Sequence, residues 1–150
     1  MNNTTYDQIW ECFINNCMVD KATLPQADEG KYILISEGCR YYNTLVDDTE
    51  VNLKTNNDLE SINIKLDDKR ILLLSYCMRY KFLENEKIRF EQVWQPLSRD
   101  IGIKSYRDQI NSRQETLNET KREIGRLLSR MDNMSYLWWY LWENIMVTIG

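Results

Sequence analysis

Two pairs of adjacent carboxylates, Asp47-Asp48 and Asp67-Asp68, are the side chains of this chain that could most readily do chemistry. Carboxylate oxygens are the preferred ligands of divalent cations such as Ca²⁺. Each pair, however, lies where one pattern of apolar residues gives way to another. Aspartate is also a preferred residue of turns and helix N-termini. We therefore interpret both pairs as turn and capping residues, and we expect no metal site.

Other catalytic chemistry has little support in the sequence. No histidine occurs among its 150 residues, which removes the commonest general base and every histidine-dependent triad. There is no glycine-rich phosphate loop and no GxSxG motif. Cys12, Cys17, Cys39 and Cys77 form no CxxC pair and no zinc-type spacing, so we expect reduced core residues. We predict neither an enzyme nor a bound cofactor.

The strongest signal for binding lies in residues 136–150, which gather large aromatic side chains near the C-terminus. Three of the five tryptophans fall within five residues of one another there. Each large aromatic can bury about 150–250 Å². A patch of this size left in water is typical of an interaction site. The residues that we expect to dock on a partner are Tyr136, Trp138, Trp139, Trp142 and Ile145.

Charge is divided unevenly along the chain. The formal net charge is −4, but residues 1–60 hold eleven acidic and four basic residues, whereas residues 104–131 hold four acidic and seven basic ones. Acidic surfaces repel nucleic-acid phosphates, which argues against a nucleic-acid-binding surface in the first half. Its acidity serves solubility, or it forms an acidic wall past which an anion slides without binding.

Apolar periodicity predicts mostly helices in the first half of the chain. The expected elements are a helix over 6–17 capped by Thr4 or Thr5, a helix over about 25–42 with Pro25 in its first turn, a short irregular β-hairpin within 45–66, and a helix over 71–83 capped by Asp67. The last helix is apolar on nearly all sides, which is typical of a central buried helix. Its expected core residues are Ile71, Leu72, Leu74, Cys77, Met78 and Phe82, packed against Trp10, Phe13, Ile35 and Cys39.

The second half predicts a further helix from about Glu86, which Pro96 perturbs or ends, and then the longest helix, over residues 105–131. Ser105 and Asp108 have the spacing of a capping box at its start. Its apolar residues form a narrow seam, so we expect this helix to protrude and to offer the seam to a partner. The seam residues expected to dock are Leu117, Ile124, Leu128 and Met131.

These elements together predict a mainly α fold: a small helical bundle with a short β-hairpin, a long protruding C-terminal helix and an aromatic tail. A chain of 150 residues is long enough to bury one real core. We expect one helical domain over residues 1–131 and a docking tail over residues 132–150.

Several patterns follow one another between Tyr32 and Met131. A helix end, RYY at 40–42, and the acidic pair at 47–48 precede an alternating strand with an acidic cap, SINIKLDD at 61–68. That strand leads directly into the apolar run RILLL, and a long, charge-rich helix ending in LLSRM follows. In this order the patterns resemble the head–tail connector adaptor proteins of tailed bacteriophages.

The resemblance implies a mostly helical subunit of a dodecameric ring that binds under the portal of the phage head. It implies contacts with the portal protein, with neighbouring subunits and with a tail or stopper protein below. DNA would pass through the lumen without specific binding, and Asp47, Asp48 and Glu50 would face that channel. Such a protein belongs to the virion neck, and it is in the host cytoplasm during assembly.

Two other classes remain open. The aromatic tail could anchor a membrane-peripheral protein, since Trp and Tyr favour the headgroup region. That stretch is short for a span, however, and contains Glu143 and Asn144. The seam of the long helix could instead form the coiled-coil dimer of a regulatory phage protein.

Overall fold

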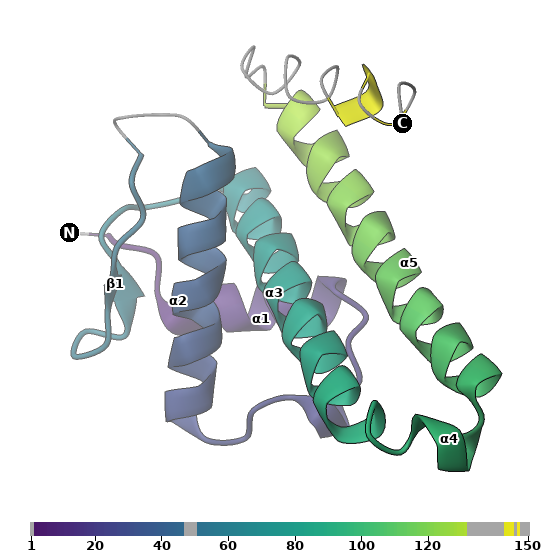
Figure 1. The fold of residues 1–150 in the computed structure, drawn as a ribbon. Coiled ribbons are helices and arrows are strands. Elements are labelled where there is room, and N and C mark those ends of the chain that lie inside the picture. The colour runs from purple at the N-terminus through teal and green to yellow at the C-terminus, as the bar shows by residue number, and fades with distance from the viewer. Residues whose placement is uncertain (1, 47–50, 132–142, 146, 148–150) are drawn as a thin grey trace.

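The computed structural model describes residues 2–46, 51–131, 143–145 and 147. Its elements are α1 (Tyr6–Asn16), the 3-10 helix η1 (Lys21–Thr23), α2 (Asp28–Leu45), β1 (Thr55–Asn56), β2 (Ser61–Ile62), α3 (Asp68–Trp94), α4 (Ser98–Ile101) and α5 (Ile103–Ser129). Figure 1 shows α3 between α2 and α5, with α1 crossing behind. The described part is mainly helical with one small antiparallel hairpin, which confirms the predicted fold class.

The segment before α1 ties the first helix to the β-hairpin. Thr5 is the N-cap of α1 in a capping box: its hydroxyl accepts from the Gln8 N–H, and the Gln8 side chain accepts from the Thr5 N–H at 3.0 Å. The buried Thr4 hydroxyl accepts a hydrogen bond from the Leu66 N–H at 2.8 Å. The Thr4 carbonyl accepts another from the Ile62 N–H at 3.0 Å. The two strands are shorter than the alternation suggested, and these bonds hold them in place.

Helix α2 begins at Asp28, three residues later than the position of Pro25 suggested. It packs closely on α3 because Gly38 faces that helix without a side chain. A Cβ at Gly38 would lie 2.4 Å from Cγ of Met78 and 3.3 Å from its backbone. Glycine is a weak helix former, but at position 38 its missing side chain allows the close approach of two helices.

Helix α3 is continuous over 27 residues, so the two helices predicted around residues 71–83 and from Glu86 are one. Asp67 caps it as predicted, with its carboxylate accepting from the Arg70 N–H at 2.9 Å. No residue in its interior breaks a helix, and Pro96 lies two residues beyond its end. Of the expected core residues, Leu74, Cys77, Met78 and Phe82 are buried, Ile71 is partly buried against the core, and Leu73 rather than Leu72 is fully buried.

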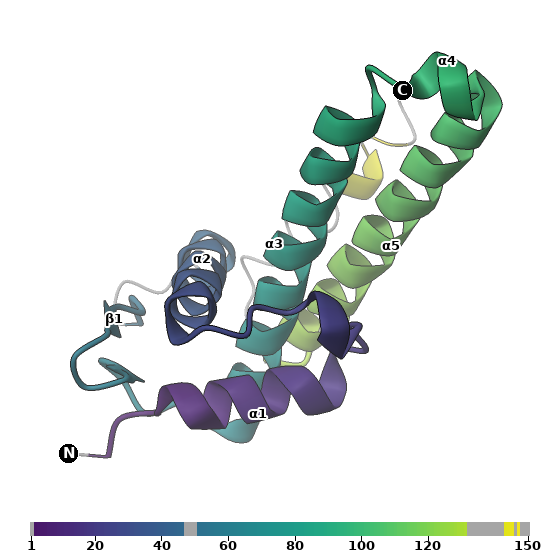
Figure 2. The ribbon, with the colours of Figure 1, turned by 90° about the horizontal axis from the view of Figure 1, so that it is seen from below.

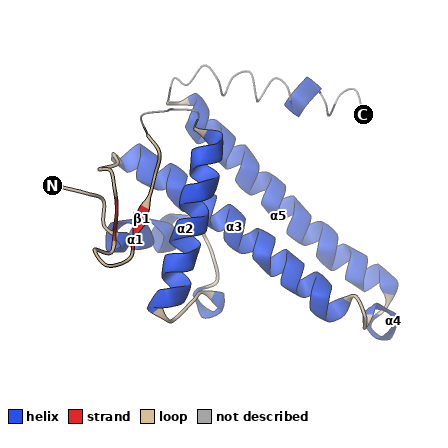
Figure 3. Ribbon diagram, turned by 60° about the vertical axis from the view of Figure 1, so that its left-hand side comes forward, coloured by secondary structure: helices blue, strands red, loops and turns tan. Residues whose placement is uncertain are grey.

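Helix α5 runs back along α3, as Figures 2 and 3 show, and it does not leave its apolar seam free. It begins after Gly102, whose φ of +89° makes the turn, and not at a Ser105 capping box. Since α3 is apolar on nearly all sides, it has a face for α5 as well as for α1 and α2. The expectation of an exposed seam is therefore corrected.

The ends of α3 and α5 nevertheless extend past α1 and α2, with α4 at the far end (Figure 3). Neither α3 beyond Phe82 nor α5 before Leu117 has a buried residue. We call residues 90–113 the distal arm. In the described residues, no helix is long and apolar enough to cross a membrane.

Candidate interaction surface

The seam residues predicted to dock on a partner lie inside the subunit. Leu117 and Ile124 are 4% and 2% exposed, and Leu128 is fully buried. Met131 is half-buried against the same core. Because α3 covers this side of α5, the seam is not an exposed docking surface in the described subunit.

The remaining predicted site residues fall mostly outside the described residues, which is so for Asp47, Asp48, Glu50, Tyr136, Trp138, Trp139 and Trp142. Ile145 is described, and its side chain is 53% exposed. Its neighbour Glu143 approaches Lys121 of α5, with a carboxylate oxygen 3.9 Å from Nζ. Ile145 is thus accessible to a partner, whereas the seam is not.

Three acidic side chains of α3 and its cap have structural partners. Asp67 caps α3, Glu84 pairs with Lys81 at 3.3 Å, and Glu86 lies 3.4 Å from Arg89. Across the described ranges, no three carboxylates or cysteines come together as metal ligands would. The thiol of Cys77 is fully buried, and burial raises its pKa well above the ordinary value. A thiol held in its protonated form is a poor nucleophile and a poor metal ligand.

Among the residues that the structure describes, the largest group of exposed apolar side chains lies at the end of the distal arm, where α3 turns through α4 into α5. We call it the apolar tip. It comprises Val93, Trp94, Leu97, Ile101 and Ile103, which are 38–59% exposed. The Leu97 N–H donates to the Trp94 carbonyl at 3.0 Å, and the Leu97 carbonyl accepts from two N–H groups of α4. The turn is hydrogen-bonded, so the apolar tip is a formed surface.

The distal arm behind the tip is held by an aromatic and charged stack between its two helices. The ring of Phe90 on α3 lies against that of Tyr106 on α5. The guanidinium carbon of Arg113 lies 3.9 Å from the Phe90 ring centroid. Lys87 donates to the Gln114 side chain at 2.8 Å. These contacts link α3 and α5 where the buried core has ended.

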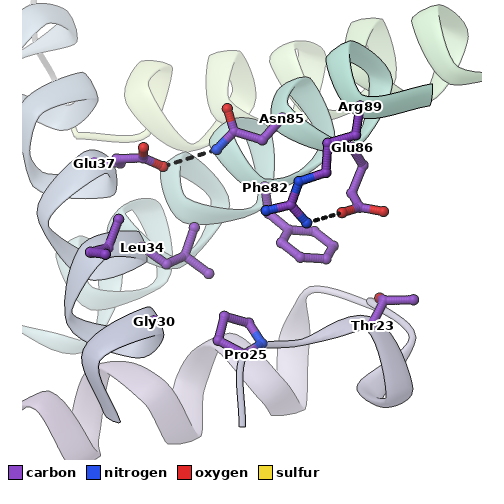
Figure 4. A pocket seen from close by; sticks show the side chains of 10 residues that line it. Thr23, Pro25, Gly30, Leu34, Glu37, Phe82, Asn85, Glu86 and Arg89 are labelled. Atoms are coloured by element: carbon purple, nitrogen blue, oxygen red, sulfur yellow. Dashed lines mark hydrogen bonds and ion pairs between the residues drawn. The ribbon is translucent and has the colours of Figure 1, made fainter. Parts of the chain in front are cut away.

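A groove between α2 and α3 is the second accessible feature, and we call it the α2–α3 groove (Figure 4). Its volume is about 370 Å³. Its lining residues are Thr23, Pro25, Gly30, Ile33, Leu34, Glu37, Phe82, Asn85, Glu86 and Arg89. Pro25, Leu34 and Phe82 give it an apolar floor, and Ile33 is 61% exposed. Asn85 donates to the Glu37 carboxylate at 3.1 Å across the groove.

Sequence reasoning did not identify the apolar tip as a surface. It predicted only a helix from about Glu86, which Pro96 perturbs or ends, before the long C-terminal helix. The available signal was five large apolar residues within eleven positions around Pro96 and Gly102. Two helix breakers beside such residues favour a turn, and side chains on a turn have little to pack against.

Comparison with known proteins gives one consistent result. A family model described as the YomZ prophage protein matches residues 1–134, which include the apolar tip and the α2–α3 groove. The SPbeta prophage-derived uncharacterized protein YomZ of Bacillus subtilis (strain 168) is 40% identical over 125 residues, covering 83% of this chain and 93% of that protein. No solved structure gives a significant match.

Proposed function

The chain belongs to the YomZ prophage protein family, and from that premise we propose that it is a structural subunit of the phage particle, an adaptor of the head–tail connector. The observation that carries the proposal is the apolar tip. Its five large apolar side chains are exposed at the end of an arm that extends past the rest of the subunit. Exposed apolar patches of this kind mark interaction sites. In this proposal the apolar tip is a surface through which the subunit binds another protein.

The described side chains support assembly better than catalysis. The carboxylates of Asp67, Glu84 and Glu86 are engaged in a helix cap and two ion pairs. Of the two carboxylates that line the groove, Glu86 lies 3.4 Å from Arg89 and Glu37 accepts a hydrogen bond from Asn85. Each subunit of a ring must contact its neighbours, and an exposed arm that extends past the rest of the subunit can make such a contact.

In this proposal the remaining parts of the connector follow the family resemblance. The segment over residues 136–145 clasps the portal protein, and a tail or stopper protein binds the opposite side of the ring. Twelve copies surround the lumen, and the acidic segment with Asp47, Asp48 and Glu50 faces the passing DNA. The α5 seam takes no part in the clasp, because α3 already covers it.

The packing of α5 also bears on the coiled-coil alternative. A dimeric coiled coil buries its seam against a second copy. Here Leu117, Ile124 and Leu128 are buried within one subunit. Forming that dimer would require α5 to leave α3, which disfavours a regulator that dimerises through this helix.

The direct test is a stop codon in the gene, introduced into the phage or prophage that encodes this protein. Induced cells should accumulate DNA-filled heads and separate tails, and expression of the chain in trans should restore tailed particles. Antibody labelling of restored particles should mark the neck in electron micrographs. Normal tailed particles from the mutant, or absence of the protein from purified particles, would overturn the proposal.

A further inference from the structure

We propose that the apolar tip of one subunit docks in the α2–α3 groove of the next copy around the ring. This inference rests on the proposed function, and it names the occupant of both surfaces. The two surfaces use different residues: the groove lies beside η1 and the N-terminal half of α2 and ends on α3 at Arg89, whereas the apolar tip begins one helical turn later at Val93 and continues through α4 to Ile103. A contact between two different patches is head-to-tail, and such contacts close into rings when the rotation allows it.

The groove can accept the apolar side chains of the tip. Its floor is formed by Pro25, Leu34 and Phe82, and its volume of about 370 Å³ leaves room for a large side chain. Trp94 and Leu97 are 38% and 42% exposed. Large aromatic side chains in fitted pockets are the usual anchors of protein interfaces. Both partners would bury apolar surface that the single subunit leaves in water.

Charge is complementary between the two surfaces: in the groove Glu86 and Arg89 pair with each other at 3.4 Å, which leaves the negative charge of Glu37. Beside the tip, Arg99 and Lys104 are basic and Asp100 is acidic, so the tip has a net positive border. Of these, Arg99 and Lys104 make no ion pair with any residue that the structure describes. Within the same described part, Glu37 of the groove is bonded to the neutral Asn85 and to no cation. A basic residue of a neighbouring tip would supply the missing partner of Glu37, which would favour a correctly oriented encounter.

The test uses two full-length variants that each remove one side of the contact. Leu97→Asp changes the tip and Ile33→Asp changes the groove, and both side chains are exposed in the single subunit, so the fold should persist. Leu59→Asp is the matched control, because Leu59 is 69% exposed on the hairpin, outside both surfaces. Sedimentation velocity over a range of protein concentrations measures the assembly state.

A head-to-tail contact makes a specific prediction for mixtures. The wild type and Leu59→Asp should form species larger than dimers, and each of the other two variants alone should stay monomeric. An equal mixture of Leu97→Asp and Ile33→Asp should form dimers and nothing larger, because it holds one intact tip and one intact groove. In a second measurement, Glu37→Lys should raise the dissociation constant by about tenfold or more and reduce its dependence on salt.

Several results would overturn the inference. They are a mixture that stays monomeric, a Leu97→Asp variant that assembles like the wild type, a wild type that stays monomeric throughout, or a Glu37→Lys variant with unchanged assembly. The proposed function would fail by a different result, normal tailed particles from the stop-codon mutant. Tailless heads together with a monomeric mixture would show that the protein is an adaptor whose subunits make another contact.

Discussion

The ring of Phe90 on α3 stacks on the ring of Tyr106 on α5, with centroids 5.9 Å apart and planes inclined by 13°. The Arg113 guanidinium covers Phe90 at 3.9 Å, which adds a cation–π contact. The pair lies beyond Phe82 and Leu117, the last buried residues of the two helices in this direction. In the distal arm, where neither helix has a buried residue, this aromatic stack holds α3 and α5 together and so positions the apolar tip.

Replacing Phe90 with Ala should loosen the distal arm while the rest of the subunit stays folded. Aromatic pairs contribute about 0.5–1.5 kcal/mol, and a cation–π contact about 0.5–1 kcal/mol at exposed sites. Amide hydrogen exchange should accelerate in residues 90–113 and stay unchanged in α1 and α2. Tyr106→Phe is the control, since it keeps the stacked ring. Equal acceleration throughout the chain would show that the arm and the body unfold as one unit.

Leu74→Ala should destabilise the whole subunit by about 2–5 kcal/mol, because Leu74 is fully buried in α3 and truncation leaves a cavity. Leu72→Ala, two residues away on the same helix, should cost about 1 kcal/mol or less because its side chain is only half-buried. Urea unfolding followed by circular dichroism measures both values. Similar losses for the two variants would contradict the placement of Leu74 in the core.

The sequence predicted those parts of the fold that depend on local chemistry. Asp67 was predicted as a cap, and Thr5 as one of two alternatives with Thr4, because a short polar side chain precedes an apolar helical pattern. The burial of Phe13, Ile35 and Met78 followed from helical periodicity, and the structure confirms it. These features depend on a few neighbouring residues, so a single sequence suffices to find them.

The partner of the α5 seam could not be predicted in the same way. Periodicity shows that Leu117, Ile124 and Leu128 share a face that must be covered, but it does not say whether the cover belongs to the same subunit. The deciding fact is that α3 has a third apolar face, and this depends on how α1 and α2 already pack on it. The apolar tip was missed because its side chains on the turn have no regular period.

A matched pair of substitutions on α5 distinguishes the observed packing from the exposed seam that the sequence suggested. Ile124→Asp places a carboxylate against α3 at a position 2% exposed, so it should detach or unfold α5 and cost several kcal/mol. Ile103→Asp on the same helix, at a position 56% exposed, should leave stability within about 0.5 kcal/mol. Thermal unfolding compares the two. A stable Ile124→Asp subunit would show that the seam is exposed and that it is again a candidate docking surface.

Thiol reactivity should separate Cys12 from the other three cysteines. Cys17, Cys39 and Cys77 are buried, and burial raises the pKa values of Cys17 and Cys39 to about 12, whereas the side chain of Cys12 is partly exposed. A thiol-reactive dye at pH 8 should label one cysteine rapidly and the others at the rate of unfolding. Cys12→Ser should abolish the rapid phase, and rapid labelling that survives in this variant would contradict the assignment.

The same thiols predict how stability depends on pH. Their pKa is higher in the folded state than the ordinary value of 9, so the folded chain holds protons that the unfolded chain releases in alkali. Stability from this source is complete below pH 9 and is lost progressively as the pH rises towards about 12. Partly buried tyrosines such as Tyr41, whose pKa burial also raises, act in the same direction. The urea midpoint should therefore fall between pH 8 and pH 11, and an unchanged midpoint would refute the buried state of these groups.

Deleting residues 134–150 should separate folding from attachment to the phage head. Glu143 contacts the body through an ion pair with Lys121 in which both side chains are more than one-third exposed, and such pairs contribute about 0–1 kcal/mol. The truncated subunit should therefore stay folded and become more soluble. It should fail to bind portal-bearing heads, because aromatic anchors often contribute more than about 2 kcal/mol each to an interface.

A full-length variant with Trp138, Trp139 and Trp142 replaced by Ser is the matched control, and it should fail in the same assay. Normal attachment of both variants would show that another surface clasps the head. Loss of folding on truncation would place the aromatic segment in the core of its own subunit.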